Sequence, residues 1–136
     1  MKTLILIALV LALGACSAHS PFILTNTTEG KSATSAKKYQ SHSKPVLVTQ
    51  SGLPADIQYE LVETVEVGKI WYGGSSSVDE SMAARAREIG ADAVILTKHW
   101  HQPSGFSWAA PHGSGQAVKI LNVDPAAIKT IPGTWM

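Results

Sequence analysis

Three histidines stand close together in this sequence, and imidazole is the side chain that most often binds metal ions. His99 and His101 are separated by one residue, and His112 follows eleven positions after His101. On a strand, the first two imidazoles would point to the same side, about 7 Å apart. With His112 approaching from across a loop, three nitrogens could hold zinc or copper. The alternative is a polar loop in which the histidines make hydrogen bonds or stack on neighbouring tryptophans.

Serine residues beside these histidines raise the question of nucleophilic catalysis. A serine nucleophile needs a base within reach and a third group that orients the base. The sequence offers candidates for each role. The nucleophile would be Ser104, Ser107 or Ser114, the base would be His101 or His112, and the orienting acid would be Asp92. The sequence lacks the Gly-x-Ser-x-Gly pattern of a nucleophile elbow. We therefore predict no catalytic residues and expect a protein that is not an enzyme.

The stretch 99–115 is also rich in aromatic residues. It contains Trp100, Phe106 and Trp108, and Trp71 and Tyr72 come earlier in the chain. Clustered aromatic rings with polar tips are typical of protein interfaces. We predict a partner surface made of Trp100, Phe106 and Trp108. A second interpretation, compatible with the first, is that Trp100 and Trp108 fold over the sheet and close a small core.

Formal charge argues against a nucleic-acid partner. The chain has 11 Lys and Arg residues against 10 Asp and Glu residues. Removal of residues 1–15 takes away Lys2 only, which leaves 11 − 1 = 10 basic residues and a formally neutral chain. Nucleic-acid binding needs a clustered basic surplus, which this composition does not supply.

Residues 1–15 have the form of an export signal. A short positive start is followed by ten uninterrupted apolar residues, Leu4 to Leu13, too few to cross a bilayer as a helix. The segment ends in Leu13, Gly14, Ala15 and Cys16, and these four residues resemble the lipobox of bacterial lipoproteins. The resemblance implies cleavage between Ala15 and Cys16 and acylation of Cys16. The alternative is an ordinary secretory signal followed by a chance cysteine.

The lone cysteine and its neighbour bear on location. One cysteine has no partner for a disulfide within its own chain. Lipoproteins carry a diacylglycerol and an N-acyl chain on the cysteine, and at ~0.8 kcal/mol per buried methylene several chains hold a protein firmly on a membrane. Ser17 stands where an aspartate is associated with retention in the inner membrane, so the resemblance implies the periplasmic face of the outer membrane. Apart from this covalent lipid, we expect no cofactor.

The rest of the chain divides into a tether, a domain and a tail. Residues 16–44 are rich in Ser, Thr, Lys and Ala with little apolar periodicity, which predicts a flexible tether. A small domain is expected over 45–124. Residues 125–136 are expected to form a C-terminal tail, with one helical turn after Pro125 and with Trp135 packing back.

A helix over about 78–89 is the best-defined element of the domain. Ser77 and Glu80 have the spacing of a capping box. Gly90 supplies the left-handed residue that ends a helix. Three residues form one apolar stripe on the helix: Met82, Ala86 and Ile89.

Short strands are expected on both sides of this helix. Residues 46–49 form a first strand, and 57–67 alternate so that one face enters the core; a helix over 55–67 is the alternative. The inward residues of that second strand are expected to be Tyr59, Leu61, Val65 and Val67.

The second strand is expected to continue through Tyr72 past a bulge at Gly68. After the helix, Ala93 to Leu96 are predicted to be a fully buried strand, and 116–123 a further one, with 99–115 as a hairpin between them. This order predicts an α+β fold: a small, mostly antiparallel sheet of about four strands with one helix on one face.

The helix-to-strand phrase from Ala86 to Val94 resembles a group of small bacterial domains. These are the YbjQ family, labelled as heavy-metal-binding, and the distantly similar envelope-stress lipoprotein RcsF. The resemblance covers roughly residues 57–121. RcsF has cysteines for disulfides in its domain, and this chain has none there.

These observations together predict a non-enzymatic binding module of the cell envelope. Cys16 would attach it to the membrane, and the 99–115 hairpin would bind an envelope protein. Three alternatives remain: a periplasmic metal-binding protein using His99, His101 and His112, a purely structural envelope component, and a weak hydrolase.

Overall fold

A computed structural model of the chain describes residues 27–28 and 39–136. The predicted leader, Cys16 and most of the predicted tether lie outside the described residues. The strands are β1 (Thr27–Thr28), β2 (Leu47–Val48), β3 (Tyr59–Gly68), β4 (Ala93–Ser104), β5 (Ser107–Ile120) and β6 (Thr134–Trp135). The helices are α2 (Ser76–Ile89) and the short 3-10 helix η1 (Pro125–Ile128).

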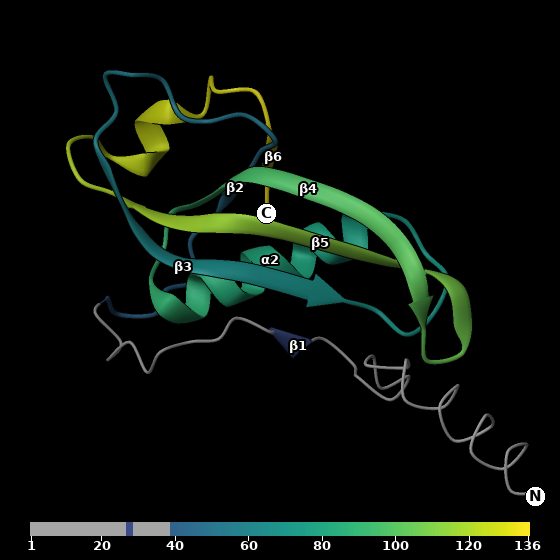
Figure 1. Cartoon of the computed structure of the whole chain (residues 1–136). Helices are drawn as coiled ribbons and strands as arrows, with labels where there is room; N and C mark the ends of the chain where they lie inside the picture. Colours follow the sequence, from purple (N-terminus) through teal and green to yellow (C-terminus); the bar gives the residue numbers. More distant parts are fainter. Residues whose placement is uncertain (1–26, 29–38) are drawn as a thin grey trace, which may run out of the picture.

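The fold is α+β, as the sequence predicts. The described residues form one six-stranded sheet in the order β1-β3-β5-β4-β2-β6, with α2 packed against one face (Figure 1). Neighbouring strands are antiparallel except β2 and β4, which are parallel. The two strands that the sequence did not indicate, β1 and β6, have two residues each. We call the face covered by α2 the inner face and the opposite face the outer face.

The helix ends where the sequence predicts and begins earlier. Gly90 has a φ of 76° and its N–H contacts the carbonyls of the last turn, as a left-handed C-cap does. At the other end the N-cap is Ser75, with no side-chain cap, so the predicted capping box of Ser77 and Glu80 is wrong. Ser77 lies inside the first turn, and its hydroxyl donates to the Gly74 carbonyl at 3.0 Å.

The inner face holds the main core of the domain. The predicted apolar stripe of α2 is buried, with Met82 and Ala86 inaccessible to solvent and Ile89 at 9% exposure. These side chains pack on valines and alanines of three strands: Val65, Val67, Val94 and Ala117, with Val46 and Val48 at the edge. Helix and sheet are also joined by Arg85, whose Nε and Nη2 donate to Glu63 at 3.0 and 2.9 Å.

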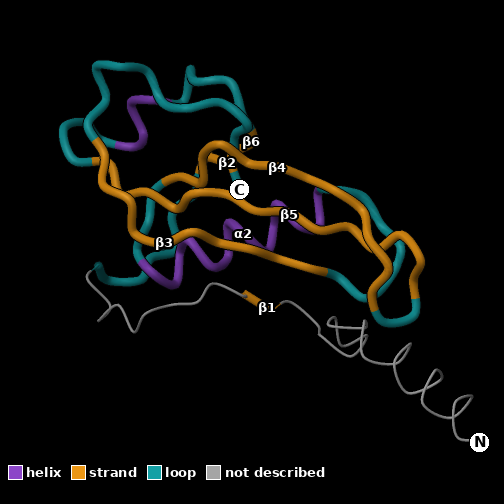
Figure 2. Tube along the Cα trace, viewed as in Figure 1, coloured by secondary structure: helices purple, strands orange, loops and turns teal. Residues whose placement is uncertain are grey.

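Side chains of the described residues cover the outer face at the end far from the β4–β5 turn (Figure 2). There Leu47, Ile95 and Val118 pack against half-buried side chains of the loops and the C-terminal segment: Leu53, Ile131 and Trp135. Trp135 therefore packs back, as expected, and β6 pairs with β2 at the edge of the sheet. The helical turn expected after Pro125 is η1.

Strand β3 departs from its predicted alternation. Val65 and Val67 are buried, but Tyr59 and Leu61 are 42% and 51% exposed, so the prediction that they face the core is wrong. The cause is a shift in the pairing with β5 between Leu61 and Glu63. One extra residue in a strand turns every side chain before it to the other face. The bulge is therefore here and not at Gly68, where β3 ends without continuing through Tyr72.

The stretch 99–115, predicted as a hairpin between two short strands, belongs to one long hairpin that includes those strands. Strands β4 and β5 have 12 and 14 residues and are joined by a two-residue turn, Gly105 and Phe106. A second bulge lies between Ile95 and Lys98, where Leu96 has a φ of 54°. Leu96 is 44% exposed, so the prediction of a fully buried strand through this residue is wrong. Among the described residues no helix has the length and hydropathy of a membrane span.

Candidate functional site

The hairpin places the three candidate histidines on two faces of the sheet. His99 and His101 flank Trp100 in β4, and Trp100 is paired directly with His112 of β5. Directly paired residues share a face, whereas successive residues of a strand alternate. His112 is therefore on the outer face, and His99 and His101 are on the inner face.

The three histidines also have different surroundings. His99 Nε2 lies 2.7 Å from Asp79 Oδ1 of α2, His101 is exposed, and His112 is 8% exposed. No group of three His, Cys, Asp or Glu side chains within the described ranges is placed to hold a metal ion. The prediction of one zinc or copper site from these three histidines is therefore wrong, because the strand register separates them.

The candidate catalytic triad is also separated by the fold. The Asp92 carboxylate accepts hydrogen bonds from Lys119 Nζ at 3.0 Å and from the Ile120 N–H at 3.1 Å. Both bonds lie at the start of the hairpin, far from its turn. His112 is eight residues from Ile120 along β5, a separation of ~27 Å. Asp92 therefore cannot orient His112 or His101 as a base.

The Trp100 and His112 rings stack on the outer face. Their centroids are 6.0 Å apart and their planes differ by 19°. The His112 ring extends over Gly68 of β3, where an added Cβ would collide with Nδ1. Glycine is therefore needed at position 68 for a close approach rather than for its backbone angles. The stack thus occupies a row of three directly paired residues, Gly68, His112 and Trp100, across β3, β5 and β4.

Within the described residues, the buried imidazole of His112 lacks a hydrogen bond that buried polar groups usually have. Its Nε2 is buried and has no hydrogen-bond partner in the described part of the chain. Burial lowers the pKa of His112, and the charge that His101 can carry lowers that pKa further. The imidazole is therefore neutral at pH 7.

A polar rim surrounds this stack. The next row across the same three strands is Glu66, Ser114 and Lys98, in which the two end residues are exposed and of opposite charge. Trp100 Nε1 donates to Gln102 Oε1 at 3.0 Å, which holds the indole along the strand. We call Trp100, His112 and this rim of Glu66, Lys98, Gln102 and Ser114 the outer-face site.

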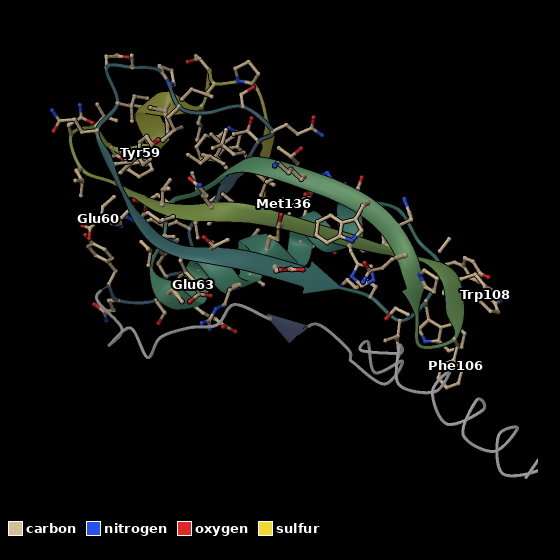
Figure 3. The ribbon with its side chains drawn as sticks, viewed as in Figure 1. Tyr59, Glu60, Glu63, Phe106, Trp108 and Met136 are labelled. Carbon is tan, nitrogen blue, oxygen red and sulfur yellow. The ribbon has the colours of Figure 1, made fainter. Side chains whose placement is uncertain are left out.

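The turn of the hairpin carries a different surface. Trp71 stacks on Phe106 with ring centroids 5.3 Å apart, and the Phe106 N–H donates to the Ile70 carbonyl at 3.2 Å. Phe106 and Trp108 extend from the end of the hairpin, away from the helix (Figure 3). Four aromatic residues are largely exposed here, Trp71 at 60%, Tyr72 at 63%, Phe106 at 74% and Trp108 at 83%. We call these four residues the tip patch.

The predicted partner surface is thus two surfaces. Trp100 belongs to the outer-face site, whereas Phe106 and Trp108 belong to the tip patch. The interpretation that Trp108 closes the core is wrong, because β3 ends at Gly68 and no described strand reaches Trp108 from that side. The pairing of Gly68 with His112 could not be found from the sequence, since it depends on the register of β3 against β5.

Sequence reasoning also missed contacts at the opposite end of the domain. Tyr39 Oη donates to Glu60 Oε2 at 2.8 Å, and the His42 N–H donates to the Arg87 carbonyl at 3.1 Å. His42 Nε2 lies 2.8 Å from the Ala91 carbonyl and 3.9 Å from Asp92 Oδ1. Residues assigned to the tether therefore bind the end of α2 and the start of β4.

No family model matches this chain, and no curated protein and no solved structure is significantly similar to it.

Proposed function

We propose that this chain is a non-enzymatic interaction module of the bacterial cell envelope, attached to the outer membrane by a lipid on Cys16. The lipobox resemblance at Leu13 to Cys16 supports the anchor. The resemblance of the phrase from Ala86 to Val94 to the YbjQ and RcsF domains supports a role in the envelope and is part of the same proposal. In this proposal the domain binds an envelope protein through its hairpin.

The protein partner binds at the outer-face site. The observation that carries this assignment is the Trp100 ring, half-buried on His112 and bordered by the polar side chains of Glu66, Lys98, Gln102 and Ser114. Protein interfaces combine an aromatic centre with a polar rim that excludes water. Glu66 and Lys98 provide charges of both signs in that rim, which favours a protein surface of mixed charge.

The buried Nε2 of His112 adds to this argument. A buried polar atom without a hydrogen bond costs about 1–3 kcal/mol, and a partner that supplies the bond recovers part of that cost. A neutral imidazole nitrogen can either donate or accept, depending on its tautomer. We expect binding to move the Trp100 ring and give His112 a polar neighbour.

Site-specific photo-crosslinking in cells tests this function. A photoreactive amino acid replaces Lys98 on the outer face, and in a matched chain it replaces Glu88, whose side chain is 66% exposed on α2. We expect a discrete protein adduct from position 98 only, and its loss on Trp100→Ala but not on Trp135→Phe. Equal adducts from both positions, or none from position 98, would contradict the proposed binding surface.

The anchor is tested separately. We expect a palmitate analogue to label the wild-type chain and not Cys16→Ser, and membrane fractionation to place the labelled chain with the outer membrane. Mass spectrometry that finds an unmodified, freely secreted chain would remove the anchor from the proposal. That result would leave the outer-face site untouched.

A further inference from the structure

Thr27 and Thr28 of the tether pair with the sheet at the same end as the tip patch. Strand β1 pairs with the last two residues of β3, with Thr27 opposite Gly68 and Thr28 opposite Val67. The pairing is antiparallel, and β3 runs toward the hairpin turn. The N-terminal end of β1, at Thr27, is therefore the end nearer the hairpin turn and the tip patch.

The length of the chain that precedes Thr27 limits where the membrane lies. Eleven residue steps separate Cys16 from Thr27. A residue spans at most about 3.6 Å, so Cys16 is within roughly 40 Å of β1. The hairpin turn is about five residues beyond the row of Gly68, His112 and Trp100, or ~17 Å. A membrane that holds Cys16 is therefore within reach of the tip patch.

The tip has the composition of a membrane interface contact. Residues 70–78 and 99–115 include no Asp, Glu, Lys or Arg. Three charged residues border these segments. Lys69 Nζ donates to Ser81 Oγ at 2.6 Å, Asp79 lies against His99, and Lys98 is exposed on the outer face, two residues before the stacked His112 and Trp100 row. Tryptophan and tyrosine are enriched at the level of lipid headgroups, where their rings are half in an apolar phase.

We infer that the tip patch inserts its aromatic rings into the headgroup region of the membrane that holds Cys16. This inference rests on the proposed acylation of Cys16. The contact is a second attachment beside the lipid chains, and it turns the hairpin toward the bilayer. The outer-face site, about five residues back along the strands, then stays open to a protein partner.

The absence of charge in these segments is what favours lipid over protein at the tip. Protein interfaces are enriched in arginine and usually carry a polar, charged rim, as the outer-face site does. An ionised side chain at the tip would oppose insertion, and the sequence has none there. At the turn Ser104 pairs with Ser107 and the Phe106 N–H donates to the Ile70 carbonyl, which lowers the cost of carrying these backbone groups toward the apolar phase.

Quenching by brominated lipids tests this contact. The acylated full chain is reconstituted in vesicles of phosphatidylethanolamine and phosphatidylglycerol with bromine on the acyl chains. One variant keeps only Trp108, and a matched variant keeps only Trp135, with the other three tryptophans changed to phenylalanine. Trp135 pairs with Leu47, which pairs with Ala93 at the start of β4, some eleven residues or ~36 Å from the turn.

We expect Trp108 emission to be quenched and shifted to shorter wavelength, and Trp135 emission to be unchanged. Thermal unfolding checks that both variants are folded. In the wild-type chain, hydrogen exchange at 104–108 should be slower on vesicles than in detergent. High salt should leave the quenching unchanged, because the patch is uncharged.

Three results would overturn the inference in distinguishable ways. An unmodified Cys16 in the mass spectrum removes the anchor and the tip contact together. An acylated chain whose Trp108 is not quenched removes the tip contact alone. A photoreactive residue at position 106 that captures a protein in cells assigns the tip to that protein instead of to lipid.

Discussion

Two tryptophans of the same hairpin lie in different environments. Trp100 is half-buried, stacks on His112 and donates a hydrogen bond from its indole N–H to Gln102. Trp108 is 83% exposed. The difference comes from the width of the sheet at each position. At Trp100 four strands, β1, β3, β5 and β4, lie side by side, and Gly68 leaves room for the imidazole, but β3 ends there. Sheet width, rather than residue type, separates the outer-face site from the tip patch.

The largest predicted effect tests the role of Gly68. In Gly68→Ala the new methyl group collides with the His112 ring, and we expect a loss of about 1–3 kcal/mol in the free energy of unfolding. In a His112→Ala background the same change should be neutral or stabilising, since glycine within a strand costs roughly 0.5–1 kcal/mol relative to alanine. Denaturant unfolding of the four chains measures the coupling. Additive effects would mean that the two positions do not touch.

A second prediction compares the two tryptophans directly. Trp100→Ala removes the ring that covers His112, and we expect a loss of about 1–3 kcal/mol in unfolding free energy. Trp108→Ala should change it by less than about 0.5 kcal/mol, because the side chain is largely in solvent. Thermal and denaturant unfolding give both values. Equal losses would show that Trp108 also covers part of the core.

The smallest predicted effect concerns pH and His112. In the unfolded chain this group titrates near 6.5, and burial gives it a lower pKa in the folded chain. Between the two pKa values the unfolded state binds more protons, so stability present above about pH 6.5 is lost as pH falls through the folded pKa.

His112→Phe keeps a ring against Trp100 and removes both the titration and the unpartnered nitrogen. We expect this variant to be at least as stable as the wild type at pH 7, and to lack this part of the acid dependence. The difference between the two stability profiles over pH 5–8 isolates His112, because the other histidines are present in both chains. Profiles that run parallel would contradict the burial argument.

Contacts close in the chain could be predicted, and contacts that depend on register could not. The end of α2 at Gly90, its stripe of Met82, Ala86 and Ile89 and the turn after Pro125 need only neighbouring residues. In β3 the residues Val62 and Glu63 do not fit the alternation of apolar and polar side chains. The meaning of this irregularity, a bulge that exposes Tyr59 and Leu61, required the pairing with β5.

The sequence by itself therefore determined the fold class, the helix and the aromatic, uncharged composition of 99–115. Only the tertiary structure decided that His112 faces away from His99 and His101, and that Trp100 and Trp108 belong to different surfaces. The physical reason is the two-residue period of a strand: one residue of register moves a side chain to the opposite face, and register is set by pairing between distant segments.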